Sequence, residues 1–597
     1  MKYIHRDRTY RFTDYLIIPF RAAPIPSCGK CLNMLLTALM TTAQAMATAL
    51  FVDTALAIFA GNAVYHAIFT PLIYLLLIVA YGTVSNTVDH FTTLGIDQQL
   101  AGTYRAEILE KRARLAYCNI EDNATWDLIT RVCKEPELQI RTAFCNILEM
   151  VSIVVRVGSL LLLITTQVWW AGIVILAISV PLFLISKKAG QKEYTAWKEA
   201  EKHRRRADYL KNVILSREAA EERSLFGYTE DVNRRWLERD EQSRRIEQKT
   251  LKEQFIRMKA SSIITALLSL SIIAILLFPY ARGELSSGMF ISLVTATLSL
   301  VQMMSWQLSS TTNTFAKNME YLRDLTKFCA LTETDGALDP PVSAESVNFG
   351  TITFQNVSFR YPGTEKDILR NLNLTLEPGR HYAIVGVNGA GKTTLTKLLT
   401  GLYDNFEGEI LIGGRSIRGF TQAQLKAMFG VVYQDFARYY IKVADNIALG
   451  NVLSYDEAKI REAAQFIGID EAIRQLPQGY DTYLGKIHEG GVDISGGQWQ
   501  RLAIARILYN PAHMRILDEP TAALDPVAES EVYRMFGQIS AGQSTIFITH
   551  RLGAARLADD IIVLDGGRVA EQGSHEALLS AGGIYAEMFE AQRSWYV

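Results

Sequence analysis

The sequence predicts a multidomain chain, in which an all-α polytopic membrane domain precedes an α/β domain. Apolar runs of about 20 residues, the length needed to cross a bilayer, occur only before about residue 325. After about residue 350, short strand-like runs alternate with helix-like runs, as in α/β proteins. A mean hydropathy of +0.09 despite 21% charged residues agrees with this segregation. We expect a transmembrane domain over 1–330, a linker over 331–349 and the α/β domain over 350–597.

Six segments of the first domain are apolar enough to be membrane-spanning helices. They cover about 32–59, 66–86, 146–167, 169–187, 260–280 and 289–311. Lys2, Arg6 and Arg8 belong to a basic N-terminal stretch, which the positive-inside rule places in the cytoplasm. Six crossings then put the loops 87–145 and 188–259 and the α/β domain on the same cytoplasmic side. Both loops mix charges with apolar residues, a pattern typical of long helical extensions.

The composition excludes several other classes of protein. The 61 Lys and Arg residues balance 62 Asp and Glu residues, so the sequence gives no sign of a nucleic-acid partner. Six cysteines in 597 residues do not make a disulfide framework. The chain has 25 Phe, 26 Tyr and 8 Trp residues, too many for extended disorder. We expect a multi-pass protein of the cytoplasmic membrane, with the lipid bilayer around its spans.

A phosphate-binding loop is the strongest motif of the α/β domain. The strand-like run 382–385 leads into the string G-x-x-x-x-G-K-T, and a helix-like run follows it. The predicted ATP-binding residues of this loop are Gly386, Asn388, Gly389, Gly391, Lys392, Thr393 and Thr394. Glycines let backbone N–H groups surround phosphates, and the helix N-terminus adds its positive end. We expect Lys392 to reach the β- and γ-phosphates and the Thr393 hydroxyl to ligate Mg²⁺.

Two adjacent carboxylates complete the predicted catalytic site. The apolar run 516–517 ends in Asp518 and Glu519. We expect Asp518 to hold Mg²⁺ and Glu519 to polarise the attacking water. Together with the phosphate-binding loop, they predict an α/β P-loop ATPase cassette whose cofactors are ATP and Mg²⁺.

A second anion-binding motif lies between these two. Ser495, Gly496, Gly497 and Gln498 open a helix-like run, so they offer another helix N-terminus to a phosphate. One nucleotide rarely needs two such ends from one subunit. We therefore expect this motif to serve the nucleotide held by a partner subunit.

These motifs resemble, in kind and order, those of the ATP-binding cassette (ABC) transporter superfamily. The resemblance implies that Tyr361 stacks on adenine and that Gln434 links Mg²⁺ to the membrane domain. It also implies that Asp525 contacts the opposite subunit and that His550 binds the γ-phosphate. The sequence departs from the usual pattern at Ile494, where leucine is common, and at Arg515 in the apolar run before the carboxylates. Neither departure removes a catalytic group.

The resemblance covers essentially the whole chain, because six spans followed by one cassette is the layout of an exporter-type half-transporter. It implies coupling segments at 223–227 and at 121–128. The string after Ser495 is also similar to bacterial lantibiotic and bacteriocin exporters. The short stretch before the first span leaves no room for the peptidase domain that some of those exporters carry.

The motifs imply a dimer, because one cassette carries half of each composite ATP site. Every catalytic motif is intact, so a homodimer is preferred over a heterodimer. The expected function is ATP-driven export of an amphipathic peptide or lipophilic compound by alternating access. Two alternatives keep the same architecture: an importer of exporter-type fold, as in siderophore uptake, and an ATP-gated channel or regulatory ATPase.

Some polar residues of the membrane domain stay open to two interpretations. Glu149 and Arg156 share one face of the third span, and Asp53 lies in the outer part of the first. Ionisable groups in spans either line a cavity or lock helices together. Cys28 and Cys31 lack a second Cys or His pair nearby, so a metal or redox role is not indicated.

Overall fold

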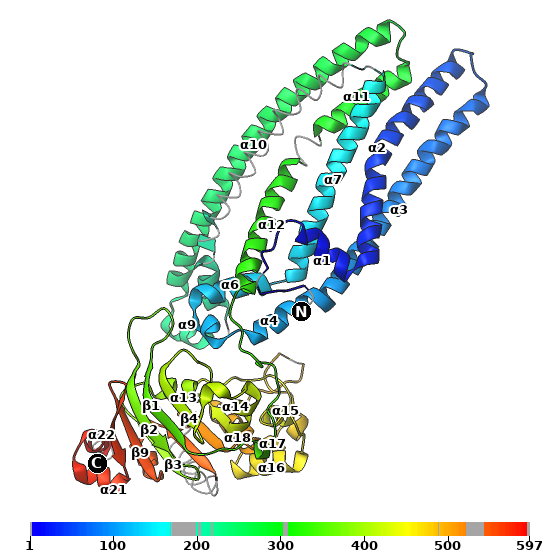
Figure 1. The fold of residues 1–597 in the computed structure, drawn as a ribbon. Helices are drawn as coiled ribbons and strands as arrows, with labels where there is room; N and C mark the ends of the chain where they lie inside the picture. Colours follow the sequence, from blue (N-terminus) through cyan, green and yellow to red (C-terminus); the bar gives the residue numbers. More distant parts are fainter. Residues whose placement is uncertain are drawn as a thin grey trace. The chain divides into compact units, whose positions relative to one another are not determined.

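The computed structural model describes residues 3–6, 8–167, 169, 199–200, 203–204, 206–216, 219–302, 308–487, 489–520 and 543–593. The chain forms two compact units, drawn in Figure 1. The first unit comprises Met1–Glu110 and Asp127–Ala330. The second comprises Lys111–Trp126 and Leu331–Val597, so a short stretch from between two helical regions belongs with the C-terminal half.

Helices make up the described part of the first unit. They are α1 (Asp14–Ala22), α2 (Pro24–Phe59), η1 (Tyr65–Ile68), α3 (Phe69–Leu100), the π-helical turn η2 (Ala101–Arg105), α4 (Ala106–Arg114), α6 (Asn123–Cys133), α7 (Pro136–Gln167), α9 (Ala220–Phe226), α10 (Thr229–Ala281), α11 (Ser287–Gln302) and α12 (Leu308–Cys329). α4 and α6 each cross the boundary between the units. α9 ends where the sequence turns, because Gly227 takes the left-handed conformation (φ 63°) typical of a helix C-terminus.

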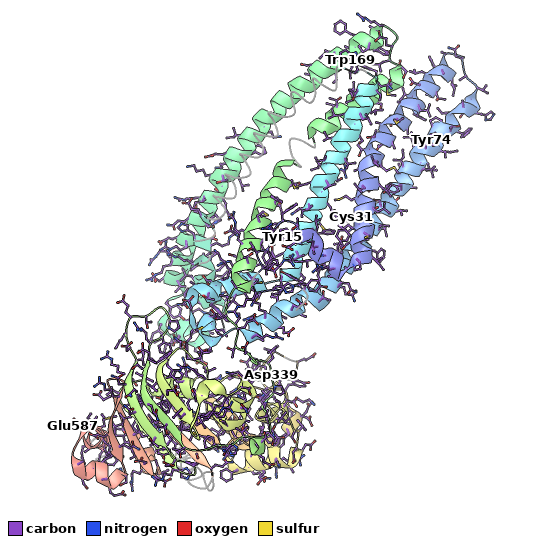
Figure 2. All side chains as sticks on the ribbon, in the orientation of Figure 1. Tyr15, Cys31, Tyr74, Trp169, Asp339 and Glu587 are labelled. Atoms are coloured by element: carbon purple, nitrogen blue, oxygen red, sulfur yellow. The ribbon has the colours of Figure 1, made fainter. Side chains whose placement is uncertain are left out.

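Among the described residues, three helices are long and apolar enough to cross a membrane: Pro24–Phe59, the continuous Tyr65–Arg114 and Pro136–Gln167. They contain the first three predicted spans. The predicted span 260–280 lies within α10, and 289–311 falls on α11 and the start of α12, with 303–307 outside the described residues. The span 169–187 lies outside them apart from Trp169. Apolar side chains of α3, including Tyr74 in Figure 2, are exposed, as expected of a helix that contacts lipid.

Polar side chains join α2 to α3, which pack side by side (Figure 1). Lys30, only 4% exposed, donates to Asp89 Oδ1 and Thr93 Oγ1, each at 2.7 Å. Farther along α2, Asn33 and Ser85 exchange two hydrogen bonds, of 3.0 and 2.9 Å. Such interhelical bonds satisfy polar groups that lipid cannot. Cys28 is exposed and Cys31 half-buried, and no cluster of three or more metal-ligating side chains occurs among the described residues.

Asp53 locks two helices together. Its carboxylate accepts from Ser286 Oγ at 2.5 Å and from the backbone N–H of Gly288 at 2.6 Å, so it caps the N-terminus of α11 from α2. An acidic side chain at a helix N-terminus satisfies free N–H groups and favours the helix dipole. The structure thus favours the helix-locking interpretation at this position.

Gly288 allows α2 and α11 to approach closely, and Gly288→Ala is expected to lower thermal stability. An added Cβ would lie 2.1 Å from the backbone oxygen of Ala49, so the two helices would have to separate. Overpacking of this kind costs about 1–3 kcal/mol. Gly158→Ala on α7 is the matched control, because nothing lies within 4 Å of its added Cβ. Apparent Tm values in lipid nanodiscs test this, and equal values for the two variants would contradict the close approach.

The described part of the second unit contains two sheets. The four-stranded antiparallel sheet has the order β2-β1-β4-β5 and the six-stranded sheet has the order β10-β9-β3-β8-β7-β6. The strands are β1 (Ile352–Phe359), β2 (Leu369–Leu376), β3 (His381–Val385), β4 (Glu407–Ile412), β5 (Arg415–Ser416), β6 (Phe429–Val432), β7 (Met514–Asp518), β8 (Ser544–Ile548), β9 (Asp560–Asp565) and β10 (Arg568–Gly573). The helices are α5 (Tyr117–Glu121), α13 (Lys392–Leu399), α14 (Gln422–Met428), α15 (Val443–Ala448), α16 (Glu457–Phe466), α17 (Asp470–Arg474), α18 (Gly496–Tyr509), α20 (Leu552–Ala555), α21 (His575–Ala581) and α22 (Ile584–Arg593), with short turns η4 (Ala344–Ser346), η5 (Ile417–Gly419) and η6 (Gly479–Asp481).

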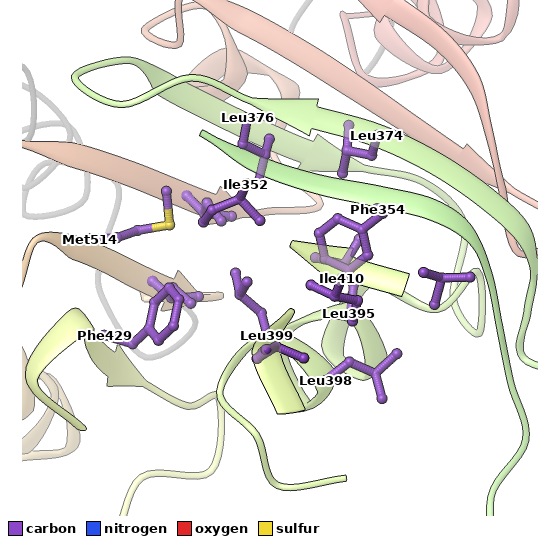
Figure 3. Packing of buried hydrophobic residues seen from close by; sticks show 14 of the residues in the cluster. Ile352, Phe354, Leu374, Leu376, Leu395, Leu398, Leu399, Ile410, Phe429 and Met514 are labelled. Atoms are coloured by element: carbon purple, nitrogen blue, oxygen red, sulfur yellow. The ribbon is translucent and has the colours of Figure 1, made fainter. Parts of the chain in front are cut away.

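The main core lies between the two sheets and α13 (Figure 3). Leu395, Leu398 and Leu399 of α13 contact apolar side chains of both sheets there, and all three are fully buried. A second core surrounds Trp499 of α18, which is also fully buried. These contacts fix α13 and α18 relative to the strands that precede them.

The sheet order brings four chain segments together. β9, β3, β8, β7 and β6 are neighbours with parallel pairing, so the carboxyl ends of these strands lie along one edge. In α/β proteins, ligands bind at this edge. The segments that follow β3, β6, β7 and β8 carry the residues singled out by sequence.

Candidate functional site

The loop between β3 and α13 is built to surround an anion. Gly386 and Gly391 have φ angles of 151° and 104°, and an added Cβ on Gly386 would lie 2.2 Å from Leu564 O. Only glycine adopts such a path without strain. Lys392 is buried, and its ammonium donates to Gly386 O at 2.8 Å and Val387 O at 3.2 Å. The lysine therefore folds over the loop that its own backbone forms.

Thr393 and Asp518 form one pair of oxygen groups. The Thr393 hydroxyl donates to Asp518 Oδ2 at 2.9 Å, which joins the start of α13 to the end of β7. Asp518 is 1% exposed, and its Oδ1 has no hydrogen-bond partner among the described residues. Burial raises the pKa of Asp518, and the neighbouring Glu519 carboxylate adds to this, against the Thr393 hydrogen bond. A buried carboxylate with a free oxygen beside a hydroxyl fits a hard divalent cation such as Mg²⁺.

Glu519 is held by both of its carboxylate oxygens. His550 Nε2 lies 2.5 Å from Oε1, and Gln434 Nε2 donates to Oε2 at 2.8 Å. These partners come from the ends of β8 and β6, on either side of β7. Glu519 also has φ of 48°, a left-handed conformation that costs a side-chain residue roughly 1–3 kcal/mol. The backbone N–H bonds to Ile548 O at 2.9 Å, so the strained turn is fixed between two strands.

The two basic groups of this site have lowered pKa values. Burial lowers the pKa of Lys392, although Glu519 and Asp518 act in the opposite direction. Burial, and then the positive charge of Lys392, lowers the pKa of His550, against the effect of Glu519. The lowered pKa favours the neutral form of His550 beside Glu519. The structure brings Lys392, Thr393, Asp518, Glu519, Gln434 and His550 together, as the motifs predict.

Tyr361 lies beside the same helix. Its hydroxyl is 2.9 Å from Thr394 Oγ1 on α13, and its ring is half-buried. Three residues that the sequence motifs did not single out surround it: Lys397, Tyr403 and Phe359. Their side chains meet only through the fold, so no local pattern could have identified them.

Ser495 caps α18 and makes its hydrogen bonds locally. Its Oγ accepts from Gln498 N at 3.2 Å, and Gln498 Oε1 accepts from Ser495 N at 2.9 Å. This capping box keeps Gly496 and Gly497 at an accessible helix N-terminus. Within the described part of the chain, no hydrogen bond joins Ser495 or Gln498 to the phosphate-binding loop. Asp525 lies outside the described residues.

Arg506 connects α18 to the segment after Gln434. Its guanidinium donates to Asn446 O at 3.1 Å, Asn446 Oδ1 at 2.6 Å and Ala437 O at 3.1 Å, and it lies 4.9 Å from the centroid of Tyr439. Burial lowers the pKa of Arg506, but the group stays charged at neutral pH. The helix that carries the second anion-binding motif is thereby held to the loop that follows Gln434.

Comparisons with known proteins agree with this geometry. The family profile described as ABC transporter matches residues 369–522. The chain is 31% identical over 495 residues to the subtilin transport ATP-binding protein SpaT of Bacillus subtilis, covering 81% of this chain and 79% of SpaT. It is 36% identical over 346 residues to an ATP-dependent lipid A-core flippase of Aromatoleum aromaticum, but that match covers only 56% of the flippase.

A solved structure extends the likeness to the whole fold. A bacterial Atm1-family ABC exporter with ATP bound superposes with a TM-score of 0.75 at 25% identity. The superposition covers 94% of this chain and 98% of that exporter. The helical unit and the two-sheet unit are therefore arranged along the chain as in a solved exporter.

Proposed function

The chain belongs to the ABC transporter superfamily, and on that premise we propose that it is an exporter that moves an amphipathic peptide or lipophilic compound out of the cell. As a member of this superfamily, it is an ATPase whose hydrolysis is coupled to transport, and it is a membrane protein. The observation that carries the ATPase role is the convergence of Lys392, Asp518 and Glu519 at one sheet edge.

The residues of this edge take the following roles in the proposal. Tyr361 stacks on adenine, and the loop from Gly386 to Thr394 surrounds the phosphates, with Lys392 turned from its own carbonyls to the β- and γ-phosphates. Thr393 and Asp518 hold Mg²⁺, with Gln434 as a further ligand. The cation, when bound, neutralises charge on the phosphates. Glu519 orients the attacking water and accepts its proton, and His550 binds the γ-phosphate.

In this proposal, the hydrogen bonds of Glu519 link ATP binding to hydrolysis. In the structure, His550 and Gln434 engage both carboxylate oxygens of Glu519. His550 would bind the γ-phosphate and Gln434 would help to hold Mg²⁺, so each would give up its bond to Glu519. One or both carboxylate oxygens are then available to the water. The left-handed backbone fixes the turn at Glu519, so the Glu519 carboxylate stays close to its present position when it accepts the proton of the water.

Half-transporters of this exporter type act as dimers, and we propose a homodimer. Each ATP lies between the phosphate-binding loop of one subunit and Ser495–Gly497 of the other, with Asp525 contacting the opposite subunit. All catalytic groups are present in this chain, which supports two identical sites. A heterodimer with a related half-transporter is the alternative. The cassette and the N-terminus lie in the cytoplasm, a placement supported by the basic residues ahead of α1.

The substrate class rests on the relatives. SpaT is named for subtilin transport, and the flippase for lipid A-core, so both act on amphipathic molecules. SpaT is matched over most of its length, which favours a peptide over a lipid.

Transport into proteoliposomes tests the direction and class. With cassettes facing outward and ATP added outside, a labelled amphipathic lantibiotic peptide is expected to accumulate in the lumen. Glu519→Gln is expected to abolish accumulation. Loss of peptide from preloaded vesicles under the same conditions would indicate import. Downhill flux that persists in Glu519→Gln with bound ATP would indicate a channel, and either result would overturn the exporter proposal.

A further inference from the structure

Lys397 occupies an unusual position beside the proposed base-binding tyrosine. Its Nζ lies 5.3 Å from the centroid of the Tyr361 ring and 5.2 Å from the centroid of the Tyr117 ring. An ammonium at this distance from a ring face is attracted by the π electrons. Lys397 is in the second turn of α13, and its side chain is only 14% exposed. One cation thus contacts aromatic rings from two distant parts of the chain.

Glu121 holds this cation in place. One carboxylate oxygen accepts from Lys397, and the other accepts from the hydroxyl of Tyr403. Burial and then the Glu121 hydrogen bond raise the pKa of Tyr403, so its phenol stays a donor. Burial opposes the charge of Lys397, but the hydrogen bond that Lys397 donates to Glu121 and the surrounding phenols raise the pKa of Lys397 overall. Lys397 therefore keeps its positive charge at neutral pH.

Tyr361 is in turn restrained by this cluster. Tyr403 contacts it edge-on, with ring centroids 5.6 Å apart and planes at 80°, and Phe359 does so at 5.1 Å and 80°. The hydroxyl of Tyr361 reaches Thr394 on α13. With Lys397 over a face of the ring, the position of Tyr361 depends on two residues that Glu121 binds directly.

Glu121 ends α5, which the chain inserts between α4 and α6. The segment Lys111–Trp126 belongs to the same compact unit as the cassette. It is also bound to the interdomain connection, since Ala116 N donates to Thr332 O at 3.0 Å and Asn119 Nδ2 to Thr332 Oγ1 at 2.9 Å. Glu121 is the first residue of the predicted coupling segment 121–128, and Tyr117 lies four residues before it.

We propose that Lys397 is a positioning residue that links the base-stacking Tyr361 to Glu121 of α5, so that base binding and the position of α5 are thermodynamically coupled. This inference rests on the proposed ATPase function. A cation on one face of the Tyr361 ring withdraws electron density and favours stacking of an electron-rich purine on the other face. Any displacement of α5 that removes Glu121 frees Lys397 and weakens that stacking.

A base-free competitor separates positioning of the base from support of the phosphate loop. In full-length protein in nanodiscs, Lys397→Met and Glu121→Gln are each expected to raise the KM for ATP about fivefold, because residues in direct contact couple by this order. The Ki of magnesium tripolyphosphate, which has no base to stack, is expected to change less than twofold. Lys397→Arg keeps the charge and the ring contact, so it should retain most of the ATP affinity that Lys397→Met loses.

Two further variants complete the design. In a Tyr361→Ala background, Glu121→Gln is expected to have little further effect on the KM for ATP, because the ring that Glu121 positions through Lys397 has been removed. Asp481→Asn is the matched control, since it breaks the ion pair with Lys442 (2.9 Å) in the same unit without touching Tyr361. Its KM for ATP should equal that of the wild type.

Several results would overturn this role. If Lys397→Met raised the tripolyphosphate Ki as much as the KM for ATP, Lys397 would be a support of α13 and not a positioning residue for Tyr361. If Glu121→Gln raised the KM for ATP as much in the Tyr361→Ala background as in the wild type, Glu121 would not act through Tyr361. An unchanged KM in Lys397→Met contradicts the positioning role while leaving the ATPase proposal intact. A wild-type protein that neither binds nor hydrolyses ATP would instead contradict the proposed function.

Discussion

Glu519→Gln is expected to bind ATP normally and to hydrolyse it about 10²–10³-fold more slowly than the wild type, the range for loss of a general base. Glutamine has the same shape, but its amide accepts no proton from water. The side chain still reaches Gln434 and His550, whose present bonds to Glu519 measure 2.8 and 2.5 Å. The substitution is also expected to keep the left-handed backbone conformation of residue 519, where φ is 48°. The loss therefore falls on kcat and not on folding.

Phosphate release and equilibrium ATP binding measure this effect. Glu377→Gln is the matched control. Glu377 follows the end of β2, and among the described residues its carboxylate accepts a hydrogen bond only from Thr351 Oγ1, at 2.9 Å. That variant is expected to turn over ATP at the wild-type rate. Turnover above a tenth of the wild-type rate in Glu519→Gln would contradict the role of Glu519. ATP should also hold the Glu519→Gln dimer closed, since hydrolysis is what reopens it.

Ser495→Arg is expected to lower ATP turnover about 10²-fold or more, as loss of preorganised phosphate donors does. The capping box with Gln498 would be lost, and a bulky side chain would stand at the accessible end of α18. The phosphate-binding loop of the same subunit is untouched. The dissociation constant for ATP at that loop should therefore change less than about twofold, within the few tenths of a kcal/mol expected for a distant site.

Ser574→Arg provides the control for lost capping. Ser574 caps α21 in the same unit, and its Oγ accepts from Ala577 N at 3.3 Å. Losing either cap costs about 1 kcal/mol of stability, so both variants should show a similar fall in Tm. Only Ser495→Arg should lose ATP turnover. Equal turnover in the two variants would show that Ser495 serves its own helix and no partner nucleotide.

The sequence predicted the parts of the fold that depend on local patterns. Apolar runs located the first three long helices, and the glycine and lysine spacing located the loop between β3 and α13. Asp518 and Glu519 were predicted from their place after an apolar run, whereas His550 followed only from the resemblance to the ABC transporter superfamily.

Contacts between distant segments could not be predicted in this way. Asp53 was left between two interpretations because its partners, Ser286 and Gly288, lie on another helix. The left-handed φ of Glu519 arises from its place between β7 and β8, which no propensity encodes for glutamate. The cluster around Lys397 needs α5, α13 and Tyr403 to converge. Such groupings depend on tertiary packing, which overrides local preference.

The central claim is that each ATP is shared by two copies of this chain. It can be tested with mixed dimers isolated by two tags, all in the Glu519→Gln form, with ATP that carries a photoreactive group on its γ-phosphate. An isotope-labelled copy carries Lys392→Ala, and an unlabelled copy carries Ser495→Arg. Only the unlabelled copy can then hold ATP in its phosphate loop, and only the labelled copy offers an intact Ser495 motif. We expect the cross-link on the isotope-labelled segment that contains Ser495, whereas a cross-link confined to the unlabelled copy would contradict a shared site.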